Sequence, residues 1–466
     1  MAPPVKTGEQ LQLYISDLNH AGEGVGKYYG FTIFVPLALP GERIWIQVKS
    51  VKSNFARGKI IEILEDSKNR VAPPCPYFQI CGGCQLQHLD YEFELNFKRK
   101  HLAQQLEKMA GVDQNLTKET VGMKTPWYYR NNMQVQVKIN DQARVGFFKP
   151  KTYQVVQIDA CLIQHQINNR VLKRLTNHLN AKRTSHEEDR PKSCGYCKVM
   201  VRSSYYTGET QLSLASGAYK IPNKEQLIQD LKCTIPEVVY IEQAEETDKN
   251  KKSLPMKQHK TFPKKDSKNN KNIVCHASPY ITEQLLGKNF KIAPGSFFQV
   301  NTLQAENLYS KLLEAIDFTP IHKVLDLYCG IGTMTILAAD HCKYAIGIES
   351  EPEAVQDAET NSQLNGCNNV SFIQGKVENK LKEEQILKFK PELVILDPPR
   401  TGCDKQVIQK LGSLFPSKIA YVSCDPATLA RDVNRIKKYG YKVHYVQPVD
   451  MFPKTTHIES LTLLSK

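Results

Sequence analysis

Two residues in the last fifty positions combine a nucleophile with an acid-base group. Cys424 ends the apolar run of YVSCDPATLARD, and Glu459 lies in HIESLTLL. Cysteine is strongly nucleophilic even with only a few per cent of thiolate near neutral pH, and a carboxylate in a dry pocket can remove a proton. The pair suits a reaction in which a thiolate adds to a ring and a base later removes a proton. A small buried thiol and a surface strand-end acid are the alternative interpretation.

A glycine turn indicates a nucleoside site. In VLDLYCGIGT, Gly330 and Gly332 let the backbone approach a ligand closely. Glu349 ends the apolar run that follows, and an acid at that point suits ribose hydroxyls. The fuller G-x-G-x-x-G pattern of phosphate-binding dinucleotide folds is absent from this motif, which favours a nucleoside without phosphates.

A second loop, LVILDPPRTG, places Asp397 at the tip of another apolar run. Its two prolines fix the loop and keep the carboxylate at the ligand edge. Related Asp/Asn-Pro-Pro-aromatic motifs serve methylation of base amino groups. Arg400 replaces the aromatic residue here, so methylation of a base amino group is only an alternative interpretation. A second alternative is that the motif is simply a rigid turn after a strand.

The cysteines form a separate pattern. The chain has 13, an odd number, and three of them, Cys75, Cys81 and Cys84, follow C-x5-C-x2-C, with Cys161 as a distant fourth. Four thiolates suit an iron-sulfur cluster or zinc, and ligand type alone leaves both open. We interpret the C-x2-C pair at 194 and 197 as chance spacing, and Cys329 and Cys403 as small hydrophobic residues.

The elements that position these residues differ along the chain. From 290 to 466, almost wholly apolar strands alternate with helical patterns, which predicts an α/β fold with a doubly wound parallel sheet. Ligands of such sheets lie beyond the carboxyl ends of the strands. Cys424 and Asp397 are both expected there.

Two further regions precede this one. Residues 7–66 read as short strands of a small β-barrel, with AGEGVGKYYG as a loop between two of them, and its interleaved cations and aromatics could contact single-stranded nucleic acid. Residues 67–289 read as a mixed α+β domain, with a helix from about Tyr91 to Met109 and a hairpin formed by NNMQVQVKI and ARVGFFK. Within it, 243–272 is a Lys-rich insert without periodicity, expected to be a flexible loop.

Charge and hydropathy narrow the class of protein. The formal net charge is +14 and the isoelectric point is near 9.0, which indicates a polyanionic partner. No apolar run approaches the roughly 20 residues that span a bilayer, and the N-terminus lacks an apolar signal core. We therefore expect a cytoplasmic protein without a membrane partner.

Together, the motifs FFQVN, DLYCGIGT, DPPR, SCDPATLARD and HIES resemble the uracil-5 RNA methyltransferase family. The leading barrel resembles a TRAM domain, and with the cysteine set the chain is most similar to the bacterial 23S ribosomal RNA branch, over nearly its whole length. The resemblance implies transfer of a methyl group from S-adenosylmethionine to carbon 5 of a uridine. That carbon is not nucleophilic by itself, and addition of a thiolate at carbon 6 would make it so.

The resemblance also implies roles for individual residues. Cys424 would be the nucleophile and Glu459 the proton acceptor. A [4Fe-4S] cluster would be bound by Cys75, Cys81, Cys84 and Cys161. The methyl donor would be contacted by Gln299, Tyr328, Thr333, Glu349, Lys376 and Asp397, where Thr333 and Lys376 replace an Asn found in some relatives.

Three alternatives stay open at this point. The RNA could be tRNA instead of 23S ribosomal RNA, the methyl acceptor could be a base amino group, or the chain could be a non-catalytic RNA-binding protein. We expect a monomer that unstacks its target uridine into the crevice at the strand ends, at a cost of a few kcal/mol.

Overall fold

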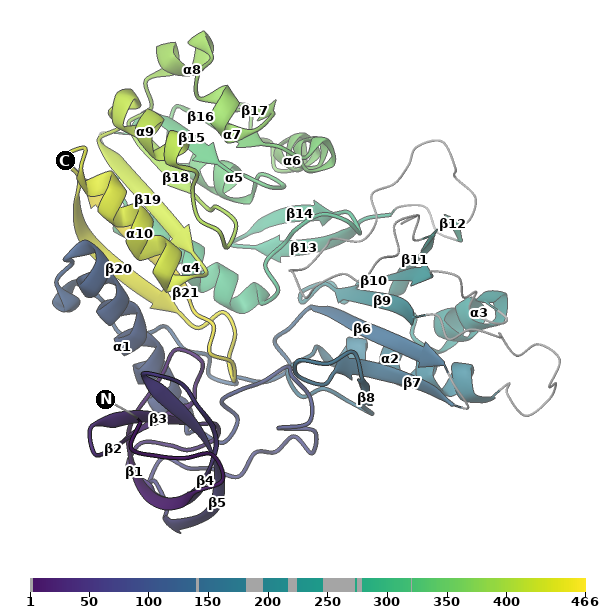
Figure 1. Ribbon diagram of the computed structural model, residues 1–466. Helices are drawn as coiled ribbons and strands as arrows, with labels where there is room; N and C mark the ends of the chain where they lie inside the picture. The colour runs from purple at the N-terminus through teal and green to yellow at the C-terminus, as the bar shows by residue number, and fades with distance from the viewer. Residues whose placement is uncertain are drawn as a thin grey trace.

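The computed structural model describes residues 3–139, 142–181, 196–216, 224–245, 273–274, 279–319 and 321–466. Three regions follow one another along the chain and lie as three lobes (Figure 1). Most of the insert predicted at 243–272 lies outside the described residues, which include only 243–245 of it. Cys194 also lies outside the described residues. No helix of the described part is long and apolar enough to cross a membrane.

The N-terminal lobe is a closed barrel, as its strand pattern predicts. Its strands pair in the order β1-β2-β3-β5-β4, and alternate side chains of β1 and β4 point into an aliphatic core. The segment interpreted as a loop contains a strand, β2, because Gly24 and Gly26 let the backbone pass closely over Ala38 and Leu13. The strands are β1 Gln10–Leu18, β2 Gly24–Tyr28, β3 Phe31–Val35, β4 Arg43–Val51 and β5 Phe55–Glu65.

Helix α1 (Tyr91–Ala110) leaves the barrel and runs beside the C-terminal lobe, next to α10 and β20 (Figure 1). Asp90 caps its first turn by accepting from the backbone N–H groups of Glu92 and Phe93, and Gly111 ends it in a left-handed conformation at φ 58°. Its apolar face joins the core of the C-terminal sheet through Leu102, Leu106 and Ala110. A short 3-10 turn, η1 (Gln114–Leu116), follows. The helix was predicted correctly, but it does not pack on the central domain.

The central lobe is a seven-stranded sheet in the order β12-β11-β10-β9-β6-β7-β8. The predicted hairpin is confirmed, because β6 and β7 pair antiparallel. Helices α2 (Gln166–Ala181) and α3 (Lys224–Thr234) cover one face and contribute leucines to its core. The strands are β6 Asn132–Ile139, β7 Ala143–Phe148, β8 Val155–Gln157, β9 Tyr196–Ser203, β10 Thr210–Ser216, β11 Val238–Glu245 and β12 Ile273–Val274.

The C-terminal lobe contains the second seven-stranded sheet, in the order β17-β16-β15-β18-β19-β21-β20. Strands β15 to β19 are parallel, which confirms the α/β prediction. β21 inserts antiparallel between β19 and β20, so the sheet is mixed where an all-parallel one was expected. The strands are β15 Lys323–Leu327, β16 Tyr344–Glu349, β17 Val370–Gln374, β18 Leu393–Leu396, β19 Lys418–Ser423, β20 Lys442–Val449 and β21 Glu459–Ser465.

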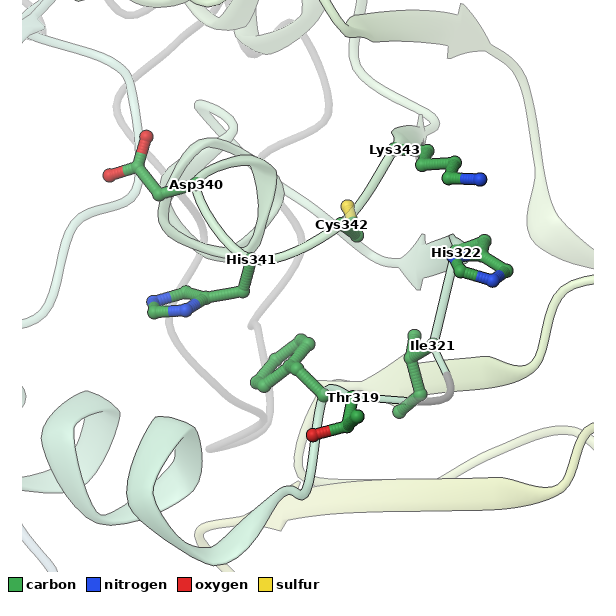
Figure 2. A pocket seen from close by; sticks show the side chains of 8 residues that line it. Thr319, Ile321, His322, Asp340, His341, Cys342 and Lys343 are labelled. Atoms are coloured by element: carbon green, nitrogen blue, oxygen red, sulfur yellow. The ribbon is translucent and has the colours of Figure 1, made fainter.

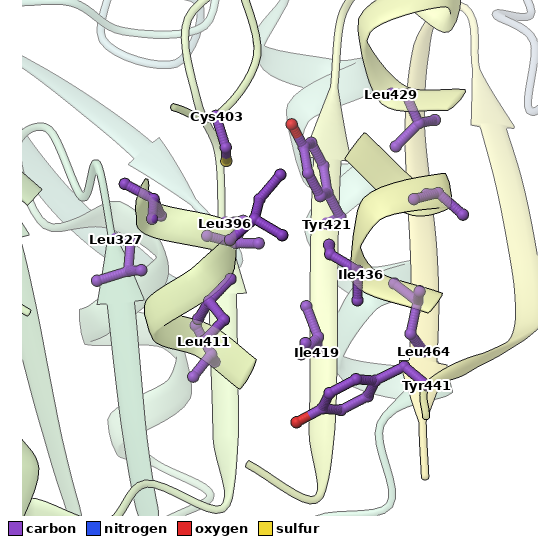
Figure 3. Close-up of a cluster of buried hydrophobic side chains, with 14 of the residues drawn as sticks. Leu327, Leu396, Cys403, Leu411, Ile419, Tyr421, Leu429, Ile436, Tyr441 and Leu464 are labelled. Atoms are coloured by element: carbon purple, nitrogen blue, oxygen red, sulfur yellow. The ribbon is translucent and has the colours of Figure 1, made fainter. Parts of the chain in front are cut away.

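Helices cover both faces of this sheet, and aliphatic side chains fill the space between the layers (Figure 3). The helices are α4 Thr302–Ala315, α5 Thr333–Ala339, α6 Pro352–Leu364, α7 Val377–Lys380, α8 Glu384–Phe389, α9 Lys405–Leu414 and α10 Pro426–Lys437. The hairpin β13 (Ile281–Leu285) and β14 (Lys288–Ile292) packs into the same lobe, although the predicted boundary at 290 cuts through it. Domain boundaries therefore stay predictions.

A cavity of about 400 Å³ lies at the amino ends of β15 and β16 (Figure 2). His322 and Lys343, which precede these two strands, line it together with Asp340, His341 and Cys342. Ligands of such sheets bind at the opposite, carboxyl ends. The cavity is therefore not part of the site described next.

Candidate active site

The proposed nucleophile and the proposed base lie at the ends of two paired strands. Cys424 directly follows β19, and Glu459 begins β21. The antiparallel register sets Ser423 opposite Ser460, so the next pair of positions along the ladder holds Cys424 and Glu459. The two side chains interact electrostatically, and Asp397 at the end of β18 interacts with both. Strand order thus brings together three residues that are far apart in the sequence.

The environment of the pair favours the uncharged forms. Burial, reinforced by Glu459, raises the pKa of the Cys424 thiol to about 12, against a smaller opposing effect of Arg400. Burial, reinforced by Asp397, also raises the pKa of the Glu459 carboxyl well above its usual range. Both shifts therefore favour the protonated form of the group. A bound cation would lower both pKa values.

A second pair of acids lies at the switch point between β15 and β18. Burial raises the pKa of both Asp397 and Asp326 to about 7. For Asp326, the nearby charge of Asp397 adds to the effect of burial. Asp326 accepts a hydrogen bond from the Thr335 hydroxyl at 2.7 Å, while its Oδ1 is buried without a hydrogen-bond partner in the described structure. No role was predicted for Asp326, since its place inside an apolar strand does not indicate which groups surround it.

The turn after β15 is built from left-handed residues: Tyr328 at φ 67°, Gly330 at φ 56° and Gly332 at φ 83°. A Cβ at Gly332 would approach Phe372 to 2.9 Å, whereas one at Gly330 would meet nothing within 4 Å. Gly332 is thus required by packing, and Gly330 leaves open space above the turn. Glu349 supports the turn by accepting from the Gly330 N–H at 3.1 Å.

The remaining predicted donor contacts differ in how far they are buried. Gln299 is buried, and so is Tyr309, whose hydroxyl pKa is raised well above its usual value by burial and by the charges of Asp397 and Glu459. Tyr328 is half-buried, and Cys403 reinforces the effect of burial in raising the pKa of its hydroxyl. Thr333 is buried at the start of α5, and Lys376 is exposed at the start of α7. Lys376 is therefore the most exposed of the six predicted donor contacts.

Tyr309 and Arg400 are two further neighbours of the site for which no role in it was predicted. Arg400 is exposed, yet its charge lowers the pKa values of Cys424 and Glu459 and so opposes part of the effect of burial. Tyr309 lies on α4, and its distance from Gln299 along the sequence does not by itself indicate a place in the site. Both enter the site through tertiary packing.

The four cysteines of the predicted cluster come from the loop between β5 and α1 and from the segment after β8. All four thiols are free and partly buried. Burial is the main cause that raises the pKa of Cys84, and the neighbouring thiols of Cys161, Cys81 and Cys75 raise it further. Tyr77 ties the two segments together by donating to Asp159 at 2.7 Å. Among the described residues, no three His, Cys, Asp or Glu side chains form a group able to hold a metal ion. The donors fit an iron-sulfur cluster in type and number, and the cluster itself stays a prediction.

Comparison with known proteins agrees with this geometry. Residues 238–466 match the family described as tRNA (Uracil-5-)-methyltransferase, and residues 4–61 match the TRAM domain. An uncharacterized RNA methyltransferase of Caldanaerobacter subterraneus subsp. tengcongensis is 39% identical over 99% of both chains, and one of Staphylococcus aureus is 37% identical over 99% of this chain and 98% of its own.

A solved structure is similar over nearly the whole chain. The Pyrococcus abyssi tRNA (uracil-54, C5)-methyltransferase, in complex with S-adenosyl-L-homocysteine, superposes with a TM-score of 0.72 at 25% identity, covering 97% of this chain and 100% of its own. Fold and site thus define an S-adenosylmethionine-dependent methyltransferase. Within that class, the chain belongs to the RNA uracil-5-methyltransferase family and has an N-terminal TRAM domain.

Proposed function

We propose that this chain methylates carbon 5 of a uridine in 23S ribosomal RNA through a covalent bond between Cys424 and carbon 6. The observation that carries the proposal is the placement of Cys424 and Glu459 at adjoining ends of the paired strands β19 and β21. The family membership supplies the methyl donor and the uracil ring. The alternative of amino-group methylation lacks a use for this thiol.

The proposed reaction has four steps. The Cys424 thiol, which is partly exposed, releases its proton to solvent water, and its thiolate adds to carbon 6, so that the electrons of the carbon 5–carbon 6 double bond move into an enolate. Carbon 5 then attacks the donor methyl, whose bond to the sulfonium sulfur breaks, and S-adenosylhomocysteine results. Glu459 accepts the proton from carbon 5. The double bond re-forms as the thiolate leaves carbon 6.

The charges of the site support a cationic donor. Asp326, Glu349, Asp397 and Glu459 cluster around the strand ends, and Arg400 is the cation that interacts with Cys424 and Glu459. S-adenosylmethionine contributes a sulfonium and an ammonium group, which offset these acids. Its binding would also lower the pKa values of Cys424 and Glu459 toward the ionised forms that the reaction needs.

The donor contacts follow from the same arrangement. We assign Glu349 to the ribose, because its carboxylate is fixed beside the open space at Gly330. Asp397, Tyr328, Gln299 and Thr333 complete the pocket, with Lys376 at its exposed edge.

The proposal is tested with purified protein, S-adenosylmethionine and RNA from cells that lack this gene. The wild type should produce 5-methyluridine, measured by nucleoside mass spectrometry. Glu459→Gln should accumulate a protein-RNA adduct that survives denaturing gel electrophoresis, because the adduct cannot lose its proton. Cys424→Ala should form neither product nor adduct.

Cys342→Ala is the matched control, because this partly buried thiol lies at the opposite edge of the sheet. It should behave as the wild type. A methylated adenosine or guanosine would refute the reaction type, adduct formation by Cys424→Ala would refute the nucleophile, and a Cys424→Ala strain with unaltered RNA methylation would favour a non-catalytic role.

The class of RNA is decided by mapping. The barrel and the cysteine set support 23S ribosomal RNA, whereas the archaeal structural relative acts on tRNA by its name, so tRNA is the second candidate. Sequencing of 5-methyluridine in both RNA classes, with and without this gene, separates them. Loss of the mark from tRNA alone would refute the ribosomal substrate. We further propose a cytoplasmic monomer, which light scattering of the purified protein tests for oligomeric state.

We also propose a [4Fe-4S] cluster on Cys75, Cys81, Cys84 and Cys161. When bound, the cluster would join the two segments through four thiolate ligands, three from the loop before α1 and one, Cys161, from the segment after β8. Iron and acid-labile sulfide should be present after anaerobic purification and be lost in Cys84→Ser. Cys233→Ser, at an exposed cysteine, is the control. Unchanged iron content in Cys84→Ser, or zinc in place of iron, would refute this assignment.

A further inference from the structure

The loop that leads into Glu459 is held along most of its length by other parts of the chain. This base loop comprises residues 450–458 and connects β20 to β21. Its backbone carbonyls at Asp450, Met451 and Pro453 accept from side chains of Gln304, Asn301 and Tyr129, respectively, at 3.0–3.1 Å. The carbonyl of Lys454 accepts from the backbone N–H groups of Gln85 and Leu86, next to Cys84, at 3.0 Å.

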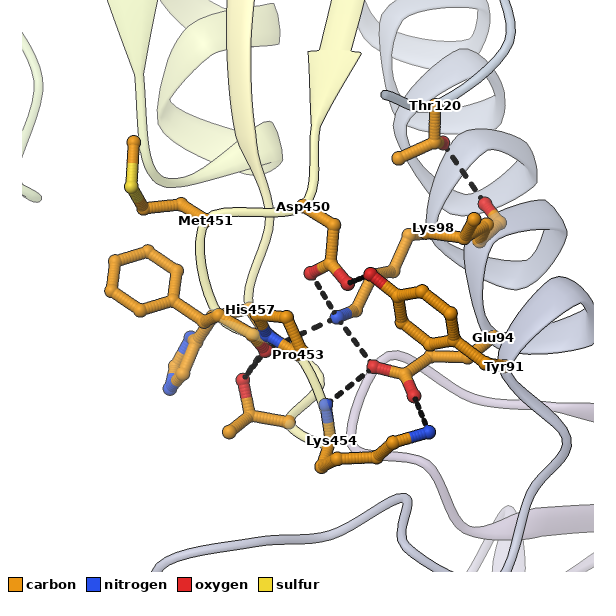
Figure 4. Close-up of polar contacts among 12 residues, drawn as sticks. Tyr91, Glu94, Lys98, Thr120, Asp450, Met451, Pro453, Lys454 and His457 are labelled. Carbon is orange, nitrogen blue, oxygen red and sulfur yellow. Dashed lines mark hydrogen bonds and ion pairs between the residues drawn. The ribbon is translucent and has the colours of Figure 1, made fainter. Parts of the chain in front are cut away.

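Lys98 lies at the centre of these contacts, as Figure 4 shows. Its ammonium group contacts Asp450 at 2.6 Å, the carbonyl of Phe452 at 3.2 Å and Glu94 at 2.8 Å. Asp450 and Phe452 belong to the base loop, and Glu94 lies one turn earlier on α1. The Lys98 side chain is 0% exposed, so it is removed from solvent and has its three donors used.

Glu94 extends the network to the same loop from the other side. Its carboxylate accepts from the backbone N–H of Lys454 at 2.7 Å, and the Lys454 ammonium approaches it to 3.4 Å. Lys454 in turn lies over the ring of Tyr91, whose hydroxyl donates to Asp450 at 2.8 Å. Two acids and two lysines therefore compensate one another within one buried cluster.

Stability alone does not account for an ammonium group in this place. Apolar side chains of similar volume usually pack as well as or better than a buried ion pair, whereas directional contacts of buried charges specify one geometry. Two of the three contacts of Lys98 fix a loop that is remote in sequence and ends at Glu459. The effect of Lys98 should therefore appear in the position of that carboxylate.

We propose that Lys98 is a positioning residue for Glu459, because its contacts with Asp450 and Phe452 set the course of the base loop. The inference rests on the proposed role of Glu459 as the base. A displacement of about 1 Å at a reacting group can slow a step by about 100-fold. Without Lys98, removal of the carbon 5 proton should slow, while the earlier addition by Cys424 continues.

The test compares Lys98→Met with Lys100→Met on the same helix. Lys100 is half exposed and contacts Asp17 of the barrel at 3.0 Å, so its loss removes a cation without touching the base loop. Lys98→Met should lower kcat by about 10- to 100-fold and accumulate the covalent RNA adduct. KM for RNA and the Kd for S-adenosylmethionine should stay within about two-fold of the wild-type values. Lys100→Met should match the wild type in adduct level and kcat.

A second variant guards against misfolding. Asp450→Asn keeps the side-chain volume and the hydrogen bond from Tyr91, but it removes the charge that Lys98 contacts. It should also accumulate adduct, to a smaller extent. Wild-type adduct levels in folded Lys98→Met and Asp450→Asn, or equal losses of adduct, kcat and donor binding, would overturn the positioning role. If Glu459→Gln itself yields no adduct, the proposed function fails instead, so the two failures are distinguishable.

Discussion

Single residues at the strand ends are held in an environment that opposes their own ionisation. Asp326 and Asp397 have pKa values raised to about 7 by burial, and the Oδ1 atom of Asp326 has no hydrogen-bond partner among the residues that the structure describes. A site with unpaired acids is unfavourable for the empty protein and favourable for a cationic ligand. Neutralising these acids should therefore stabilise the free protein and weaken its affinity for the methyl donor.

Asp326→Asn tests that opposition through pH. Because the folded-state pKa of Asp326 lies above its unfolded value, its contribution to stability is complete below about pH 4 and is lost as pH rises through about 7. Between about pH 5 and pH 8, the free energy of unfolding of the wild type should fall by up to about 3 kcal/mol more than that of the variant, and its melting temperature should fall more as well. Thermal denaturation of the free proteins measures this. The exposed Asp340→Asn should show the wild-type slope, and an identical slope for Asp326→Asn would contradict the assignment.

Glu349 carries a prediction about donor binding. Its carboxylate accepts from the N–H groups of Gly330, Ser350 and Glu351 at 3.1, 2.6 and 2.9 Å, so it is fixed before any ligand arrives. Replacing it with Ala should raise the Kd for S-adenosylmethionine about 10- to 100-fold, since hydrogen bonds to charged groups contribute about 1.5–3 kcal/mol. Calorimetric titration measures the change. RNA affinity should be unaffected, and an equal loss of both would indicate general disruption.

At the scale of an element, the turn between β15 and α5 separates packing from binding. Gly332→Ala must displace Phe372 and adopt φ 83°, so it should destabilise the fold by about 1–3 kcal/mol. Gly330→Ala has open space around its new methyl group and carries only the strain of φ 56°, about 1 kcal/mol. If that space belongs to the donor, Gly330→Ala should weaken donor binding more than it lowers stability. Urea denaturation and calorimetric titration of both variants decide this, and unchanged donor affinity in Gly330→Ala would exclude the turn from the pocket.

The elements also show what a sequence can predict. Apolar runs identified β15 to β19, because strands that are buried on both faces consist almost wholly of apolar residues. The 3.6-residue periodicity identified α1. The packing of α1 on α10 and the contact of Lys98 with Asp450 were not predictable, since both join segments more than 300 residues apart. Likewise, β2 was missed because its two glycines indicate a turn unless the barrel around them is known.

In the whole molecule, α1 connects the barrel to the catalytic lobe. Phe97 of α1 packs with Leu18 and Leu39 of the barrel lobe, while Leu102 and Leu106, further along the helix, join the core of the C-terminal sheet. The barrel is thus attached to a rigid helix and not to a free linker. RNA held by the barrel would be presented to the strand ends from a fixed direction, so barrel contacts should affect binding of RNA and not the chemical steps.

Tyr29 gives this expectation a test. The Tyr29 side chain is 87% exposed at the tip of the hairpin between β2 and β3. The centroids of the Tyr29 and Tyr28 rings are 4.7 Å apart, and the neighbouring Lys27 is exposed. Stacking of a base on an aromatic ring contributes about 1–3 kcal/mol, so Tyr29→Ala should raise KM for RNA about 5- to 150-fold and leave kcat unchanged. Steady-state kinetics measures both. Tyr439→Ala, an exposed tyrosine beyond the end of α10, is the control. A fall in kcat at unchanged KM would mean that the barrel acts on the chemical step, and an unchanged KM alone would mean that RNA is held without this face of the barrel.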